Sequence, residues 1–160
     1  MKIPIVNEKD EIIEYKDIDQ RNPEEICRSS SLWVTDPEGN ILLSQRGFSN
    51  RRSPGLWDAA AAGFVEEGET YESSIIKEAK EEIKLIELKP IIGPKFRQST
   101  SHEYFRQWFL VVINHNYPFI KNDKEVADIK WFSRQELKKL FLEKPEMFTS
   151  SLKQYFETLE

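Results

Sequence analysis

Residues 63–85 read GFVEEGETYESSIIKEAKEEIKL, and this stretch decides how the chain folds. Thr70 is a favourable N-cap residue, and Glu72 is well placed in the first turn of a helix that would follow it. The apolar residues recur at helical spacing, at Ile75, Ile76, Ala79 and Ile83. This spacing predicts an amphipathic helix that runs from Thr70 through Lys84 and packs its apolar face on a protein core.

Three glutamates of the same helix share one of its sides. Glu78, Glu81 and Glu82 are spaced i, i+3 and i+4, next to the apolar face and not opposite it. Like charges at the edge of a core repel one another and lose hydration. A hard divalent cation removes both costs, because Mg²⁺ prefers carboxylate oxygens and completes its shell with waters and substrate phosphates. The alternative is a solvated helix face on which lysines such as Lys77 balance the acids.

The spacing of the whole stretch resembles the Nudix box: a glycine, five residues, a glutamate, seven residues, then Arg-Glu-apolar-any-Glu-Glu-any-Gly-apolar. The positions that match are Gly63, Glu69, Glu78, Ala79, Glu81, Glu82 and Leu85. Two positions depart from the pattern. Lys77 replaces an arginine that can hold a carboxylate by two parallel bonds, and Lys84 replaces the glycine that ends the helix. If the backbone at Lys84 is left-handed, its side chain costs about 1–2 kcal/mol.

The resemblance covers roughly residues 29–142, because segments 42–46, 54–58 and 131–137 look like flanking parts of the family. It implies an α+β fold, the α/β/α sandwich of Nudix proteins around a mixed β-sheet. We expect one domain over residues 1–160. Its parts are an N-terminal β-hairpin extension (1–27), the Nudix core (29–142) and a C-terminal helix (143–160).

The remaining patterns predict the other elements of that sheet. A hairpin is expected from the runs Ile3–Val6 and Glu11–Tyr15 and the polar turn between them. Two further helices are expected, from Ser133 to about Leu142 and from Ser150 to Leu159. Further strands are expected at Ser31–Val34, Ile41–Gln45, Leu85–Leu88, Phe105–Ile113 and Val126–Phe132.

Composition excludes several classes of protein. The 160 residues carry a formal net charge of −5 with a pI near 5.3, which argues against a broad basic surface for extended nucleic acid. No apolar run reaches the roughly 18–20 residues that span a bilayer, and the first residues lack the apolar region of a signal peptide. Cys27 is the single cysteine, as expected in a reducing compartment. We therefore expect a cytoplasmic protein without a membrane partner.

The resemblance also implies a site. Glu78, Glu81, Glu82 and the backbone carbonyl of Gly63 would bind Mg²⁺ or Mn²⁺, while Glu69 would orient the loop before the helix. Lys77, Glu81, Glu82 and Glu125 form the predicted catalytic group. The identity of the general base is left open. Glu125 and Glu103 are candidates, and the alternative for each is an ordinary surface carboxylate. Three basic residues of one loop are candidates to hold substrate phosphates, or alternatively are exposed charges: Arg46, Arg51 and Arg52. His102 could pair with phosphate or metal, or be merely solvated.

The function implied is that of a divalent-metal-dependent Nudix pyrophosphohydrolase, which cleaves a diphosphate linkage in a nucleoside diphosphate derivative. Its partner is a small-molecule diphosphate, and since many relatives form dimers, a homodimer stays open. The N-terminal hairpin and residues 26–28 resemble the branch that contains isopentenyl-diphosphate isomerase. That isomerase needs a catalytic cysteine and histidine ligands, where this chain has Ala62, Cys27 and Phe64, so we rank it below the hydrolase. A third alternative is a degenerate domain that binds a nucleotide without turnover.

Overall fold

A computed structural model describes residues 1–159, and Glu160, the last residue of the predicted domain, lies outside them. The strands are β1 (Lys2–Val6), β2 (Ile12–Asp17), β3 (Ile26–Thr35), β4 (Ile41–Arg46), β5 (Trp57–Ala59), β6 (Ala61–Phe64), β7 (Ile91–Ser99), β8 (Glu103–Val112) and β9 (Val126–Phe132). The α-helices are α1 (Tyr71–Ile83), α2 (Arg134–Glu143) and α3 (Ser150–Thr158), with short 3₁₀ turns η1 (Ile18–Gln20) and η2 (Pro145–Met147).

All these strands join one mixed sheet, whose centre is β3. Along one edge β3 runs parallel to β8, from Ile26 opposite Glu103 to Thr35 opposite Val112. Along its other edge it pairs in turn with β1, β6 and β4, all antiparallel. Strand β4 also pairs with β5 and β9, while β7 pairs with β8. The long β3 therefore ties the N-terminal hairpin to the rest of the sheet.

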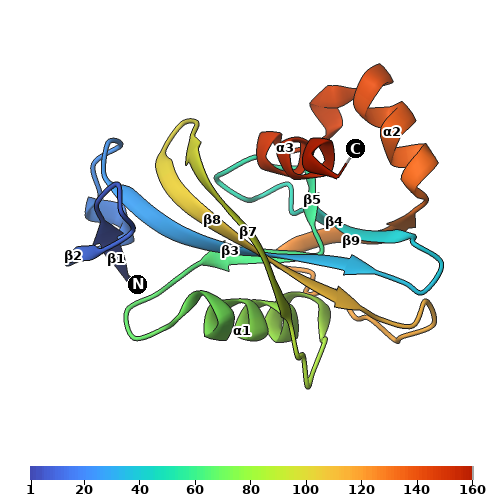
Figure 1. The fold of residues 1–160 in the computed structure, drawn as a ribbon, viewed down its shortest axis with the longest axis horizontal. Coiled ribbons are helices and arrows are strands. Elements are labelled where there is room, and N and C mark those ends of the chain that lie inside the picture. The colour runs from blue at the N-terminus through green and yellow to red at the C-terminus, as the bar shows by residue number, and fades with distance from the viewer. Residues whose placement is uncertain (160) are drawn as a thin grey trace.

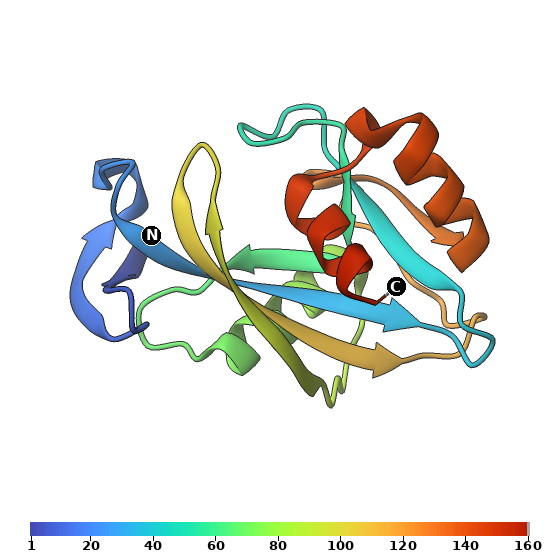
Figure 2. The ribbon, with the colours of Figure 1, turned by 45° about the horizontal axis from the view of Figure 1, so that its top comes forward.

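Helices cover both faces of the sheet (Figures 1 and 2). Because successive strand residues point to opposite faces, Trp33 and Leu43 pack with α2 and α3, whereas Leu32 and Leu42 pack with α1. The core beneath α2 and α3 is mainly aromatic and includes Trp33, Trp57, Trp108, Phe132, Phe148, Tyr155 and Phe156. The core against α1 is mainly aliphatic and includes Leu32, Leu42, Ile75, Ile83, Leu85 and Leu88. The predicted α/β/α sandwich is confirmed.

Helix α1 has the ends that its sequence predicts. The Thr70 hydroxyl accepts a hydrogen bond from the Ser73 N–H at 3.0 Å, which satisfies one of the free donors at the helix start. At the other end, Lys84 adopts the left-handed conformation, with φ 56° and ψ 31°. A side chain therefore occupies the left-handed turn where the Nudix box has glycine.

The predicted hairpin and the two C-terminal helices are confirmed, but the strand expected at Leu85–Leu88 is wrong. Glu87 has a φ of 55°, which breaks an extended run, and the Leu85 N–H instead closes α1 by donating to the Ala79 carbonyl. Leu85 and Leu88 are buried as anchors of a loop. The structure adds three strands that we did not predict, namely β5, β6 and β7.

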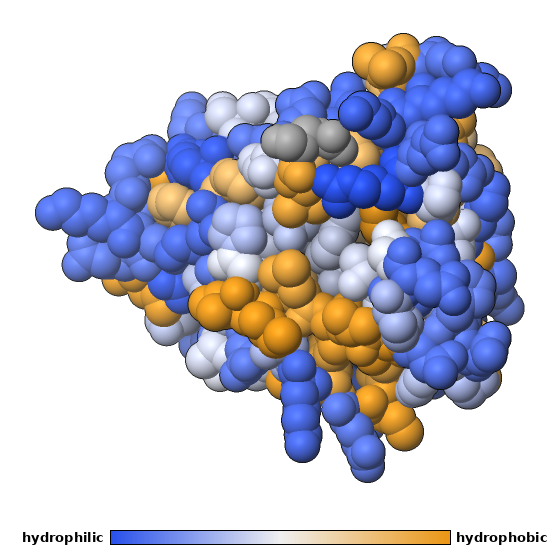
Figure 3. Space-filling model, turned by 45° about the vertical axis from the view of Figure 1, so that its right-hand side comes forward, coloured by the Kyte–Doolittle hydropathy of each residue, from blue (hydrophilic) through white to orange (hydrophobic). Residues whose placement is uncertain are grey.

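The surface carries one further feature beside the sheet edge. Figure 3 shows apolar side chains gathered among hydrophilic ones. Ile91 and Ile92 at the start of β7 and Val112 at the end of β8 are each more than 60% exposed.

Of the helices in residues 1–159, none is long and apolar enough to cross a membrane.

Candidate active site

A cleft of about 400 Å³, the acidic cleft, lies beside α1. Helix α1 contributes Glu78, Glu81 and Glu82 to its lining, and Glu125 joins them from the turn before β9. The Glu125 carbonyl accepts a hydrogen bond from the Gly47 N–H at 2.9 Å, which ties this turn to the arginine-rich loop after β4. The structure thus brings together four glutamates that the sequence analysis singled out.

Strand β6 forms one wall of the acidic cleft and positions two of these glutamates. The Ala62 N–H donates to Glu82 Oε1 at 3.0 Å, and the Glu78 side chain lies across Gly63. A Cβ atom at residue 63 would be 2.5 Å from Glu78 Cδ, closer than atoms can approach. The short strand with its small residues therefore lets α1 place its carboxylates against the sheet.

Burial and the repulsion of nearby carboxylates make the carboxyl groups of Glu78 and Glu82 hard to ionise. Burial raises the pKa of Glu78 to about 7; Lys77 opposes the rise, while Glu81 and Glu125 add to it. Burial also raises the pKa of Glu82 well above its usual range, and the nearby charge of Glu78 adds to this effect. A bound cation would therefore favour the ionised forms of both groups, which burial alone disfavours.

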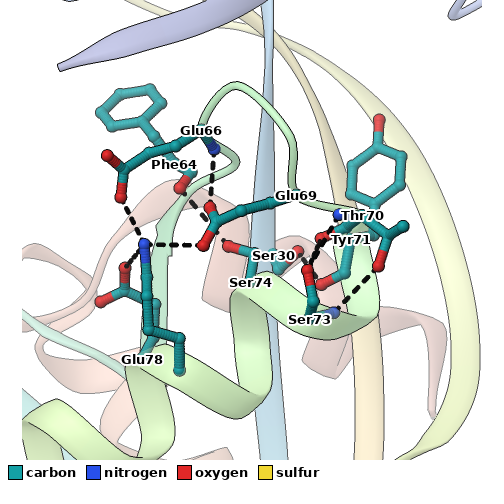
Figure 4. Close-up of polar contacts among 10 residues, drawn as sticks. Ser30, Phe64, Glu66, Glu69, Thr70, Tyr71, Ser73, Ser74 and Glu78 are labelled. Carbon is teal, nitrogen blue, oxygen red and sulfur yellow. Dashed lines mark hydrogen bonds and ion pairs between the residues drawn. The ribbon is translucent and has the colours of Figure 1, made fainter.

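Glu69 lies in the loop that leads into α1, beside Glu66 (Figure 4), and Lys77 pairs with both of these residues. The Glu69 carboxylate accepts a hydrogen bond from the Glu66 N–H at 2.8 Å and pairs with Lys77 Nζ at 2.8 Å. Lys77 also pairs with Glu66, and it lies 3.8 Å from Glu78 Oε1. Glu69 orients this loop as predicted, and Lys77 is placed to restrain Glu78, although it is not part of the cleft lining.

The donor set fits a hard divalent cation. Glu78 and Glu82 offer carboxylate oxygens whose charge a cation would neutralise, and Gly63 leaves a space that any side chain would fill. Within residues 1–159, no three carboxylate, imidazole or thiol side chains stand close enough to form a ready-made metal cage. Mg²⁺ does not need one, since it commonly takes one or two protein carboxylates and fills its octahedron with waters and substrate phosphates.

The three predicted arginines line both the acidic cleft and a second cavity of about 370 Å³ that adjoins it. Arg46 Nε donates to the Arg52 carbonyl at 2.9 Å, which folds the loop back on itself. The Arg52 guanidinium lies 4.5 Å from the centre of the Phe64 ring. Arg51 is exposed and pairs with Asp19 at 3.5 Å. Arg46 and Arg52 are thus half-buried at the junction of the two cavities.

Two other candidates lie away from the acidic cleft. Glu103 pairs with Arg97 at 3.0 Å, accepts a hydrogen bond from Ser99 at 2.5 Å and lines neither cavity. His102 lines the second cavity, where burial and the charges of nearby arginines lower its pKa to about 4. Of the two candidate bases, Glu125 is the one in the acidic cleft.

Sequence reasoning missed a buried ionic group in the second cavity. Arg106 of β8 lies 3.5 Å from Asp58 of β5 and donates to the Ser151 hydroxyl at 2.6 Å, while the Thr149 hydroxyl donates to Asp58 at 3.0 Å. The available signal was a charged residue, Arg106, near aromatic residues at the start of the predicted strand Phe105–Ile113. Its partners come from distant parts of the chain, which no local pattern reveals.

The family model of the NUDIX domain matches residues 26–153. The chain belongs to the Nudix family. This Nudix domain is therefore a hydrolase that acts on phosphoric anhydrides, and the branch that the sequence resembles is also found among its relatives. It is 28% identical to the "Uncharacterized Nudix hydrolase YfcD" of Salmonella typhi over 142 residues, 84% of this chain and 73% of that protein. It is 27% identical to an isopentenyl-diphosphate Delta-isomerase of Brevibacterium linens over 135 residues, 81% of this chain and 74% of that protein.

Solved structures share the fold of this Nudix domain. The crystal structure of DR0079 from Deinococcus radiodurans superposes with a TM-score of 0.85 at 21% identity, over 99% of this chain and 98% of that one. A MutT protein from Methanosarcina mazei Go1 gives a TM-score of 0.71 at 17% identity, over 86% of this chain and 95% of that one. The likeness to DR0079 extends over nearly the whole chain and so includes the N-terminal hairpin.

Proposed function

We propose that this Nudix domain is a Mg²⁺- or Mn²⁺-dependent pyrophosphohydrolase that cleaves the diphosphate linkage of a nucleoside diphosphate derivative. The observation that carries the proposal is the gathering of Glu78, Glu81, Glu82 and Glu125 on one cleft whose rim also bears Arg46 and Arg52. Carboxylates suit the cation, and arginines suit the phosphate oxygens. A cytoplasmic location and a homodimer stay predictions.

Each residue has a distinct part in this proposal. Glu78, Glu81, Glu82 and the carbonyl of Gly63 would hold the ion, which neutralises developing phosphate charge and acidifies a bound water. Glu125 is the proposed general base, and Lys77 restrains Glu78. Arg46, Arg51 and Arg52 would orient the phosphates, with Arg51 contributing least because its side chain is exposed and paired with Asp19.

Isopentenyl-diphosphate isomerases are among the relatives, and they are the second candidate. The branch's catalytic cysteine and two of its histidine ligands correspond to Ala62, Cys27 and Phe64 in this chain. Its two histidines do not replace those ligands, since neither His102 nor His115 lines the acidic cleft. A pure binding module is also less favoured, because it has no need for the crowded glutamates.

The experiment is a hydrolysis screen with Mg²⁺ and with EDTA. The panel contains nucleoside di- and triphosphates, nucleotide sugars, dinucleoside polyphosphates and isopentenyl diphosphate, and the phosphorylated products are identified by chromatography. We expect turnover of at least one nucleotide with Mg²⁺ and none with EDTA. Loss of turnover in Glu82→Gln, with activity kept in the control Glu72→Gln of the same helix, would support the site. Metal-independent turnover, no turnover of any compound, or isomerisation without hydrolysis would contradict the proposal.

A further inference from the structure

The second cavity, the basic chamber, has a lining whose charge is opposite to that of the acidic cleft. Four arginines line it, Arg46, Arg51, Arg52 and Arg106, against a single carboxylate, Asp58. It shares Arg46, Arg51, Arg52, Asp58, Ala62, Gly63 and Phe64 with the lining of the acidic cleft, so the two spaces adjoin. One molecule can therefore occupy both.

The single carboxylate of the basic chamber is already engaged. Asp58 faces Arg106 at 3.5 Å and accepts a hydrogen bond from Thr149 at 3.0 Å. Among residues 1–159, Arg46 and Arg52 form no ion pair with any carboxylate. Arg46 also feels the charge of Glu82 in the acidic cleft, but Arg52 is half-buried among the like charges of Arg21, Arg46 and Arg51. An anion from outside the protein would relieve that repulsion.

Aromatic rings in the basic chamber support its cations. The Phe64 ring has the Arg52 guanidinium at 4.5 Å and that of Arg21 at 5.8 Å from its centre. The Tyr104 ring is stacked with His102 at 4.6 Å and has Arg106 at 5.6 Å. These rings already stack on cations and on each other, so the chamber favours an anionic group over a nucleobase.

Hydroxyl groups and a helix start complete the lining. Thr149 caps α3, and Ser150 and Ser151 of its first turn line the basic chamber with Ser29 and Thr100. Hydroxyls donate hydrogen bonds to phosphate oxygens, and the first turn of a helix favours negative charge. Neighbouring guanidinium groups provide the forked donors that phosphate geometry matches.

We propose that the basic chamber binds a phosphomonoester carried by the substrate, separate from the diphosphate held at the acidic cleft. This inference rests on the proposed function and narrows its substrate class to diphosphates whose second arm bears a further phosphate. Arg52 and Arg106 contact that phosphate with the hydroxyls of α3, and Arg46 bridges to the diphosphate. Arg52 is thereby a specificity-determining residue.

The test uses the intact chain in EDTA, where the acidic cleft repels phosphate and binding reports the basic chamber alone. The chain has two histidines, so the imidazole Cε1–H resonances of His102 and His115 can be followed by NMR during a titration with inorganic phosphate. His115 pairs with Asp36 and stacks on Trp131, outside the chamber, and reports whether a variant remains folded. We expect His102 to shift with saturation and His115 to stay in place.

Variants and a second pair of probes decide the result. Arg52→Gln should need on the order of tenfold more phosphate for half-saturation of the His102 shift, and Arg52→Lys should need an intermediate concentration. The control Lys139→Gln, which removes an exposed charge, should need the same concentration as the unaltered chain. Ribose 5-phosphate should bind like inorganic phosphate. The inference is overturned if His102 does not respond, if Arg52→Gln binds as tightly as the unaltered chain, or if pyrophosphate binds tenfold tighter than ribose 5-phosphate. Hydrolysis is not measured here, so failure of this test leaves the outcome of the hydrolysis screen independent.

Discussion

Replacing Gly63 by alanine should weaken metal binding about 100-fold with little effect on the metal-free fold. The added Cβ would lie 2.5 Å from Glu78 Cδ, whereas ordinary contacts begin at 3.4 Å, so the carboxyl group must move by about 0.9 Å. Metal-ligand distances tolerate about 0.2 Å, so Glu78 would be lost as a ligand. The Gly63 backbone is not left-handed, and alanine there introduces no conformational strain.

The size of the effect follows from linkage. At a Mg²⁺ concentration of about 100 times Kd, the ion stabilises the unaltered protein by roughly 2.7 kcal/mol. A loss of about 100-fold in affinity leaves roughly 0.4 kcal/mol at the same concentration. For a domain of this size about 1 kcal/mol corresponds to roughly 2–4 °C, so the Mg²⁺-induced rise in Tm should fall from about 5–11 °C to about 1 °C.

The assay is thermal unfolding with Mg²⁺ and with EDTA, and Gly93→Ala is the matched control. A Cβ at Gly93 would lie 2.4 Å from Leu110 Cδ1, a comparable clash in β7 that involves none of the four glutamates. This control should lower Tm equally in both buffers and keep the full Mg²⁺-induced rise. The reasoning is refuted if Gly63→Ala keeps that rise, or if it loses several kcal/mol in EDTA.

Three further predictions concern the helix end, a buried histidine and the loop before α1. Lys84→Gly should raise the free energy of unfolding by about 1 kcal/mol, since φ is 56° there, while Lys80→Gly inside the helix should lower it by a similar amount; urea titration that ranks them otherwise would contradict this. Burial and arginine charges lower the pKa of His102 from 6.5 to about 4. Between these two pH values the unfolded chain binds a proton that the folded chain does not, so the free energy of unfolding decreases as the pH is lowered from 6.5 to about 4. Relative to the unaltered chain, His102→Asn should gain up to about 3 kcal/mol between pH 7 and pH 4, and a constant difference would show that the histidine is not desolvated. Lys77→Met leaves Glu69 without its cation and should cost about 1–2 kcal/mol by urea unfolding, and no change would exclude a restraining role.

Much of the fold follows from local patterns. The 3.6-residue spacing of Ile75, Ala79 and Ile83 fixed the buried face of α1, and Thr70 fixed its start. Strand β6 escaped prediction because alanine and glycine carry little β preference, and its strand form comes from pairing with β3. Strand β7 escaped because its residues are mostly exposed and Pro94 interrupts it.

The strand predicted at Leu85–Leu88 is the reverse case, because its sequence suits a strand but the backbone forms a loop. A short apolar run suits a buried strand or a buried loop equally, and the left-handed backbone at Lys84 and Glu87 decides between them. Glycine at a position often indicates a left-handed backbone, but Lys84 and Glu87 are not glycines, so the sequence does not indicate that the chain turns there.

Part of the site could be predicted from local sequence, and part depends on contacts between distant segments. Helical spacing alone predicts that Glu78, Glu81 and Glu82 share one side of α1. Their approach to Glu125 depends on the turn before β9, which only the family resemblance suggested. The basic chamber was not predicted, because Arg106 and Asp58 meet across strands far apart in sequence.

The central claim is that the glutamates of α1 form a divalent-cation site, and titration with Mn²⁺ followed by electron paramagnetic resonance tests it most directly. The free-ion signal reports bound Mn²⁺ without any substrate. Saturable binding in the unaltered chain and in Glu72→Gln, weakened at least tenfold in Glu82→Gln, is the predicted result. Equal binding by Glu82→Gln and Glu72→Gln, or none by the unaltered chain, would contradict the account.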